Sequence, residues 1–253
     1  MSPSFFTNKM NPKHSNNLNW WSKIFALSGL LLIAESCGTE NPTVSTPTNP
    51  ASATMLAIGD SVFDFNREEN ASIPDVVAQR LGTTVANESV GGAYLTNTLE
   101  PNNAKLDIRN QYSDRDWDWL IMNGGANDVN DECGCGECTQ TLNDIISSDG
   151  LTGALPTFVD RVTERGTRVI FMGYYDLPPT AEFGFNRCNE LVSTYEERIQ
   201  RLATRNDRMW FVDASQVIDP NNLALFQSDR VHPSIEGAKA IGDLIAEEII
   251  KLQ

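Results

Sequence analysis

The segment MLAIGDSVFDF, residues 55–65, joins an apolar run to a polar turn. Its first four residues are all apolar, which is typical of a strand covered on both faces of a sheet. Gly59 and Asp60 are turn residues that end this strand, and Ser61 follows them with a hydroxyl that a base can activate as a nucleophile. The segment therefore predicts a buried strand with Ser61 at its carboxyl end.

Short apolar runs alternate with longer helical patterns along the rest of the chain. This alternation predicts an α/β fold, in which a parallel sheet carries helices on both faces and binds ligands beyond the carboxyl ends of its strands. Ser234 is suited to begin the last helix as its N-cap. The expected strands are residues 55–58, 84–86, 119–122, 168–172 and 209–212, and the expected helices are 73–81, 139–165, 189–205 and 234–252.

The N-terminal segment has the pattern of a secretory signal. Lys9, Lys13 and Lys23 precede an apolar run at residues 24–34, and small residues follow it. A run of this length is shorter than the roughly 20 residues that a membrane-spanning helix needs. The alternative is a buried core helix, which the lack of amphipathic spacing disfavours. The pattern predicts a signal peptide within residues 1–37.

The signal ends in AESC, residues 34–37, which resembles the bacterial lipoprotein cleavage box with Cys37 as the lipidated residue. Glu35 departs from the usual small residue, so plain secretion is the alternative. Residues 38–53 are rich in Pro, Thr and Ser, as in a disordered linker. We therefore expect an exported periplasmic or cell-envelope protein that contacts a membrane only through its N-terminal lipid, with residues 54–253 as its folded domain.

Charge argues against one class of partner. Without residues 1–36 the chain carries 16 Lys and Arg against 33 Asp and Glu, a formal charge of −17. A field of this sign repels polyanions at long range. We therefore expect no nucleic-acid partner.

Four further cysteines lie in the folded domain: Cys133, Cys135, Cys138 and Cys188. In an oxidising compartment an even number of cysteines favours disulfides. We expect two disulfides, with Cys188 paired to one member of the cluster. A zinc site is the alternative, but no histidine lies near the cluster to complete a mixed site, and we expect no metal.

Only two histidines are available as a base, His14 and His232, and His14 would be lost with the signal. Asp229 lies three residues before His232, close enough to orient its imidazole and to stabilise the imidazolium. A lone His before Pro is commonly a loop or core residue. Together with Ser61, however, the two residues supply a nucleophile, a base and an orienting carboxylate.

Two glycine-rich segments follow the second and third expected strands: NESVGGAYL at residues 87–95 and NGGANDV at 123–129. Hydrolysis of an ester requires hydrogen-bond donors for the oxyanion of the tetrahedral intermediate. The amide of Gly92, the side chain of Asn127 and the amide of Ser61 could supply them. The alternative interpretation of both segments is a pair of tight turns.

Taken together and in this order, the four segments resemble the SGNH hydrolases, also called GDSL-type esterases and lipases. Gly-Asp-Ser at 59–61, Gly92, Gly125 to Asp128, and Asp229 with His232 match the blocks of that family, although Val62 follows Ser61 where Leu is commoner. The resemblance implies a flavodoxin-like three-layer α/β/α sandwich with a five-stranded parallel sheet. It also implies ester hydrolysis through an acyl-serine intermediate without a cofactor. We interpret Asp60 and Asp128 as structural residues of the motifs.

The resemblance leaves the substrate open among lipid, short-chain acyl and acetylated carbohydrate esters. Two other functions are considered: a surface-anchored binding protein on the same fold, and a redox or metal protein built on the cysteines. The intact set of motif residues disfavours the binding protein.

Aromatic residues are expected near the site. Phe63 and Phe65 follow Ser61 closely, and residues 173–185 follow the fourth expected strand with Tyr174, Tyr175, Phe183 and Phe185. Such a loop could line an acyl pocket or stack on sugar rings, or it could be an ordinary packed loop. A disulfide from Cys188 to the cysteine cluster would fix both walls of the site.

Overall fold

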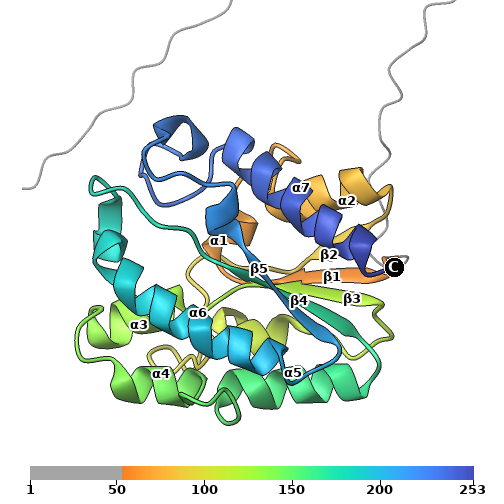
Figure 1. The fold of residues 1–253 in the computed structure, drawn as a ribbon, viewed down its shortest axis with the longest axis horizontal. Coiled ribbons are helices and arrows are strands. Elements are labelled where there is room, and N and C mark those ends of the chain that lie inside the picture. Colours follow the sequence, from red (N-terminus) through yellow and green to blue (C-terminus); the bar gives the residue numbers. More distant parts are fainter. Residues whose placement is uncertain (1–52) are drawn as a thin grey trace, which may run out of the picture. The chain divides into compact units, whose positions relative to one another are not determined.

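The computed structural model describes residues 53–253, and its centre is a five-stranded parallel sheet with the strand order β2-β1-β3-β4-β5 (Figure 1). The predicted fold class is confirmed, because helices cover both faces of this sheet. The signal peptide, Cys37 and nearly all of the linker lie outside the described residues. The strands are β1 (Met55–Ile58), β2 (Val85–Asn87), β3 (Trp119–Met122), β4 (Arg168–Gly173) and β5 (Met209–Asp213).

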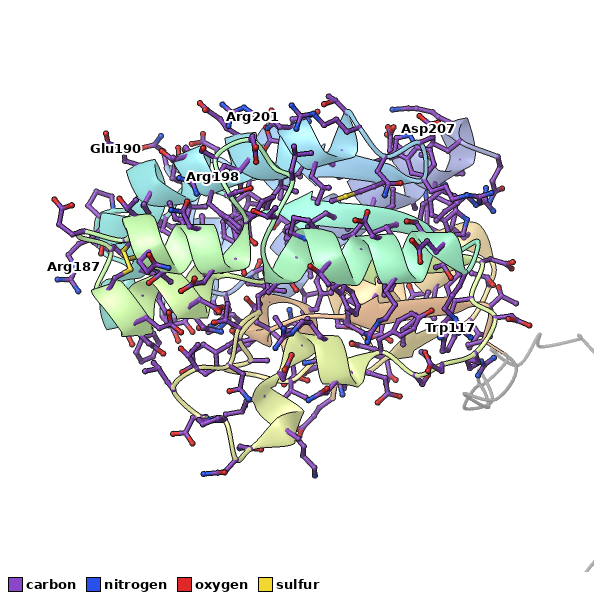
Figure 2. All side chains as sticks on the ribbon, turned by 90° about the horizontal axis from the view of Figure 1, so that it is seen from below. Trp117, Arg187, Glu190, Arg198, Arg201 and Asp207 are labelled. Atoms are coloured by element: carbon purple, nitrogen blue, oxygen red, sulfur yellow. A yellow bond between two sulfur atoms is a disulfide. The ribbon has the colours of Figure 1, made fainter. Side chains whose placement is uncertain are left out.

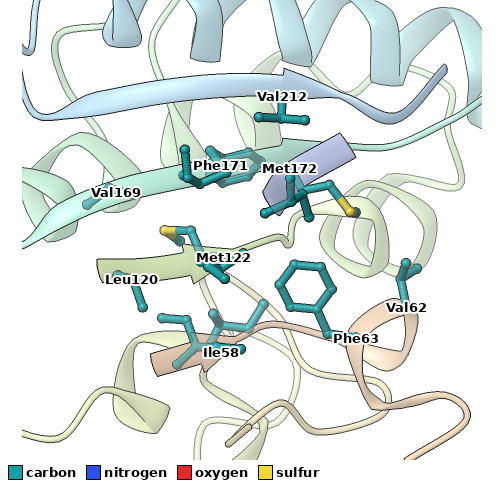
Figure 3. Packing of buried hydrophobic residues seen from close by; sticks show 14 of the residues in the cluster. Ile58, Val62, Phe63, Leu120, Met122, Val169, Phe171, Met172 and Val212 are labelled. Atoms are coloured by element: carbon teal, nitrogen blue, oxygen red, sulfur yellow. The ribbon is translucent and has the colours of Figure 1, made fainter. Parts of the chain in front are cut away.

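The strands form the apolar core because their side chains are buried on both faces. Every residue of β1 and β3 is buried, as is all of β4 after Arg168. Figure 3 shows side chains of β1, β3, β4 and β5 in this core, together with the ring of Phe63. Phe63 is therefore part of the core, anchoring the turn that carries Ser61.

The longer helices lie in two groups, one on each face of the sheet (Figure 1). The first face carries α2 (Ile73–Leu81) and α7 (Ile235–Lys251), which pack so closely that a side chain at Gly242 would collide with Val76. The second face carries α3 (Ala126–Cys133), α4 (Thr139–Ile145), α5 (Ala154–Glu164) and α6 (Asn189–Ala203).

Local sequence signals set where α2 and α7 begin. Ser72 and Asp75 form a reciprocal capping box at the start of α2. Ser234 accepts a hydrogen bond from the amide of Gly237 at 3.1 Å, so its predicted role as an N-cap is confirmed. Both helices then bury the apolar stripe that their spacing predicts.

The single helix expected over residues 139–165 is wrong, because the structure has two helices there, α4 and α5. Gly150 and Gly153 lie between them with φ of 78° and 123°, and the Ser147 hydroxyl accepts backbone hydrogen bonds of the turn. Arg198 of α6 donates to the Ile146 carbonyl at 2.8 Å (Figure 2). The turn-forming residues and this long-range contact break the helix that the apolar spacing of residues 139–165 predicted.

Smaller differences concern element ends and short elements. The second strand begins one residue later than expected, and the fourth and fifth each extend one residue further. Within residues 53–253, no helix is both long and apolar enough to cross a bilayer. The short helical elements are α1 (Ser61–Asp64), η2 (Ala104–Leu106), η3 (Ile108–Gln111), η4 (Glu182–Cys188), η5 (Ala214–Gln216) and η6 (Leu223–Leu225).

Candidate active site

The turn after β1 places Ser61 as the first residue of the short helix α1. Asp60 caps this helix by accepting a hydrogen bond from the Val62 amide at 2.9 Å. The same carboxylate accepts the Asn123 side-chain amide at 2.7 Å and the Tyr174 hydroxyl at 2.5 Å. Gly59 is required here because any side chain would collide with the amide of Asn123. The ends of β1, β3 and β4 thus hold the serine turn together, and Asp60 has the structural role expected of it.

Ser61, His232 and Asp229 form a continuous hydrogen-bonded chain. The distance from Ser61 Oγ to His232 Nε2 is 2.8 Å, and that from His232 Nδ1 to Asp229 Oδ2 is 2.7 Å. The side chains of His232 and Asp229 are only 12% and 16% exposed. A hydroxyl, an imidazole and a carboxylate in this order are able to activate the hydroxyl as a nucleophile.

Asp229 is held in its charged form. Partial burial would raise the pKa of its carboxyl, but hydrogen bonds from the His232 ring and from the amides of Val231 and His232 outweigh burial and lower the pKa. The backbone bonds also fix the carboxylate within its own loop. Its free oxygen is therefore directed at Nδ1 of His232.

Gly91, which directly precedes the predicted donor Gly92, lies next to Ser61. The amide of Gly91 donates to Asp64 at 3.2 Å, and a methyl group placed on Gly91 would lie 3.9 Å from Ser61 Cβ. Gly92 has a φ of 76°. Within residues 53–253, the amides of Ser61 and Gly92 have no hydrogen-bond acceptor. Both amides are available to a ligand.

Asn127 lies on the first turn of α3, where its side-chain Nδ2 donates to the Ala93 carbonyl at 2.8 Å. This contact joins Asn127 to the residue that follows Gly92 and leaves a second amide hydrogen on Nδ2. The next residue, Asp128, accepts the amides of Leu95 and Thr96 at 2.9 and 2.8 Å. Asp128 therefore fastens α3 to the Gly92 segment, which confirms its structural interpretation.

A cavity of about 300 Å³ opens beside Ser61 and Asn127. The aromatic loop contributes Tyr174, Tyr175 and Phe185 to its wall, whereas Phe183 is 65% exposed. Both tyrosine hydroxyls are already bound inside the protein, that of Tyr175 to the Val231 carbonyl. The expectation of an aromatic wall is confirmed for three residues. The charged side chains lining the cavity are all acidic: Asp60, Asp176, Glu196, Glu197 and Asp213.

Glu196 is a feature of this cavity that the sequence did not reveal. Burial raises the pKa of its carboxyl to about 8, the Tyr174 amide opposes this, and the charges of Asp213 and Asp176 add to it. Glu196 is therefore protonated at neutral pH. Its position in the second turn of α6 gives no sequence signal, because acidic residues are common on exposed helix faces.

The cysteines form two disulfides, Cys133–Cys138 and Cys135–Cys188. The predicted pairing of Cys188 with the cluster is confirmed, and Figure 2 shows a disulfide next to Arg187. Because these four sulfurs are bonded to one another, the thiolates that a zinc site would need are absent from them. The second bridge joins the end of α3 to Cys188, which lines the cavity. That this bridge fixes both walls of the site stays a prediction.

Comparison with known proteins identifies the family of the chain. A family model for the GDSL-like lipase/acylhydrolase family matches residues 57–240. The match covers most of the chain, so the protein belongs to this family, and the resemblance inferred from its motifs is confirmed. It is an SGNH-type enzyme, a serine hydrolase that acts on ester bonds. No curated protein sequence matches the chain.

Solved structures share the fold at low sequence identity. A carbohydrate acetylesterase from Sinorhizobium meliloti has a TM-score of 0.61 and 17% identity, over 80% of this chain and 100% of that one. A GDSL-like lipase from Bacteroides thetaiotaomicron has a TM-score of 0.55 and 19% identity, over 79% of this chain and 88% of that one. Similarity at this level supports the fold alone.

Proposed function

We propose that the protein hydrolyses carboxylic esters with Ser61 as nucleophile, His232 as general base and Asp229 as the residue that orients His232. His232 takes the Ser61 proton as Oγ attacks the ester carbonyl, and then gives it to the leaving alcohol. Water, activated by His232, attacks the acyl-serine and releases the acid and the free serine. The observation that carries this proposal is the unbroken hydrogen-bond chain at 2.8 and 2.7 Å.

The oxyanion of each tetrahedral intermediate would be bound by the amides of Ser61 and Gly92 and by Nδ2 of Asn127. The two amides have no acceptor in the described part of the chain, and Nδ2 retains one unused hydrogen. Fixed donors of this kind favour the charge that develops in the transition state over the neutral ester.

For the substrate, we propose a lipid, short-chain acyl or acetylated carbohydrate ester. The cavity of about 300 Å³ has a partly aromatic wall, which suits a short acyl chain or a sugar ring. The name of the Sinorhizobium structure, a carbohydrate acetylesterase, is consistent with the last class. The acidic lining disfavours esters with a strongly anionic leaving group near Ser61.

We further propose that the protein is exported and anchored in the cell envelope through Cys37. The Lys-rich start, the apolar run and the AESC sequence support export, and two disulfides suit an oxidising compartment. Mass spectrometry of the mature N-terminus tests this. A lipid on Cys37 that is absent from the Cys37→Ala variant is expected, and a mature chain without lipid would contradict the anchor.

The first experiment measures hydrolysis of p-nitrophenyl esters from acetate to palmitate by the purified protein and by its Ser61→Ala variant. Ser61→Ala should abolish turnover, whereas Ser148→Ala, on an exposed loop, should leave it unchanged. The chain-length profile would separate a deacetylase from a lipase. Turnover that persists in Ser61→Ala would refute the mechanism, and no turnover of any ester would favour a binding protein.

A further inference from the structure

Two residues just after α1 contact the loop that carries His232. Phe65 is the C-cap residue of α1, and its amide donates to the Ser61 carbonyl at 2.9 Å. Asn66 follows directly. Both residues are therefore fixed to the short helix that begins with Ser61, although neither belongs to the motif residues.

The ring of Phe65 stacks on the imidazole of His232. Their centroids are 3.9 Å apart and their planes differ by 8°. Ser61 and Asp229 hold the two ring nitrogens of His232 from its edges, but edge contacts leave the imidazole free to tilt out of its plane. A parallel ring against the face removes that freedom.

Asn66 contacts the His232 loop at two points, the backbone carbonyl of Pro233 and the side chain of Gln227. Its Nδ2 donates to the Pro233 carbonyl at 3.0 Å, and its Oδ1 accepts from Gln227 Nε2 at 2.8 Å. The backbone amide of Gln227 donates to the His232 carbonyl at 2.8 Å, so Asn66 reaches the His232 backbone through Gln227. Asn66 is buried, with a φ of 62°, a conformation that asparagine tolerates better than most residues. This strained position makes sense if the side chain is needed where it lies.

We propose that Phe65 and Asn66, the Phe65–Asn66 clamp, are positioning residues that set the place and plane of His232 relative to Ser61. This inference rests on the proposed function. Ser61 and His232 are 171 residues apart in sequence, so their contact depends on tertiary structure. The clamp makes α1 carry both the nucleophile and the support for its base. A displacement of about 1 Å between such groups is enough to lower a rate by about a hundredfold.

The face of the Phe65 ring has a second effect during the reaction. His232 becomes positively charged each time it takes a proton, and an aromatic face attracts a cation. The stack therefore contributes more to the transition state than to the resting enzyme. Its loss should lower kcat and leave KM nearly unchanged.

The test compares kcat and KM for Phe65→Leu, Phe65→Tyr and Asn66→Gly in the full chain. Phe65→Leu removes the ring and should lower kcat about 3- to 10-fold, with KM within about twofold, and Phe65→Tyr should restore most of kcat. Asn66→Gly keeps the left-handed backbone and removes only the side-chain bonds, and should also lower kcat. Asn97→Gly is its control, because Asn97 is another buried asparagine with positive φ, 50°, and its amide binds Asn103.

Two further readouts do not depend on turnover of an ester. The rate at which a fluorophosphonate labels Ser61 should fall in Phe65→Leu and Asn66→Gly but not in Asn97→Gly. The ring protons of His232, assigned with His232→Asn, should resonate upfield of their positions in the urea-unfolded chain, and should lose this displacement in Phe65→Leu. The wild-type spectrum tests the stack even if a variant fails to fold.

A folded Phe65→Leu with wild-type kcat, or His232 signals at their unfolded positions, would overturn the clamp. Equal losses of kcat in Asn66→Gly and Asn97→Gly would overturn the role of Asn66, because the effect would then be general destabilisation. Activity that survives in Ser61→Ala refutes the proposed function itself. If Ser61→Ala is inactive and the clamp variants are fully active, the proposed function stands and the clamp alone is wrong.

Discussion

At the scale of single residues, two carboxylates close to Ser61 have different tasks because they have different partners. Asp60 is adjacent in sequence, but the Val62 amide, the Asn123 amide and the Tyr174 hydroxyl occupy its oxygens. Asp229 keeps one oxygen directed at His232. Asp229 rather than Asp60 binds the imidazole because the oxygens of Asp60 already accept other hydrogen bonds.

Replacement of Asp229 by Asn tests this assignment. The Asn amide would donate toward Nδ1 and would favour the tautomer with a proton on Nε2, which is unable to accept the Ser61 proton. We expect kcat to fall on the order of 10³- to 10⁴-fold. The exposed Asp219→Asn, which loses only a local turn contact, should have wild-type kinetics. A loss below tenfold in Asp229→Asn would contradict the orienting role.

At the scale of elements, α3 and α6 are joined where each contributes to the site. Asn127 lies at the start of α3, and the helix leads into the cysteine cluster at its other end. Cys188 lies directly before α6, which carries Glu196. The Cys135–Cys188 bridge therefore connects the segment after the Asn127 helix to the start of the Glu196 helix.

The two disulfides should differ in their effect on stability. Cys135–Cys188 spans 53 residues, whereas Cys133–Cys138 spans 5. A longer closed loop restricts the unfolded chain more, which gives about 4 kcal/mol for the first bridge and about 2 kcal/mol for the second. Urea unfolding of the Cys135→Ser/Cys188→Ser and Cys133→Ser/Cys138→Ser variants measures this. A larger loss from the short bridge would show that loop length does not govern their effect.

At the scale of the whole molecule, the fold gathers acidic groups at the carboxyl ends of its strands. Asp176 follows β4, Asp213 ends β5, and Glu196 projects from α6 into the same cavity. No basic side chain lines this cavity in the described part of the chain. Burial, with a smaller contribution from the charges of Asp213 and Asp176, raises the pKa of Glu196 to about 8, so it holds its proton at neutral pH.

This proton links stability to pH. In the unfolded chain Glu196 loses its proton near its ordinary pKa of 4.5, but in the folded chain it keeps the proton up to about pH 8. Between these values the folded state binds more protons, so its free energy of unfolding decreases as pH rises, by an amount on the order of a few kcal/mol. Melting temperatures from pH 5 to 8 should fall less steeply in Glu196→Gln than in the wild type.

The exposed Glu197→Gln, at the neighbouring position, is the control for this effect and should retain the wild-type slope. Its carboxylate pairs with Arg201 on the surface, where solvent screens the interaction. Equal slopes in the wild type and in Glu196→Gln would show that another group is responsible for the dependence of stability on pH.

Much of the fold was predictable because its signals are local. Short apolar runs identified all five strands, β1 and β3 with their observed ends. The predicted cap Ser234 begins α7 through a contact within a few residues, as Ser72 does for α2. The residues of the hydrogen-bonded chain were also predictable, because Ser61, Asp229 and His232 lie in short motifs in a recognisable order. The break between α4 and α5 was missed because it depends partly on Arg198, more than 40 residues away.

The amino-acid sequence determined the chemistry of this protein: which hydroxyl, imidazole and carboxylate are available, and in which kind of sheet they lie. Tertiary structure alone decided how they meet. The stack of Phe65 on His232, the reach of Asn66 to Pro233 and the buried proton of Glu196 follow no periodicity or motif. The physical reason is that burial, ring stacking and long-range hydrogen bonds depend on distances between distant segments, which only the packed fold establishes.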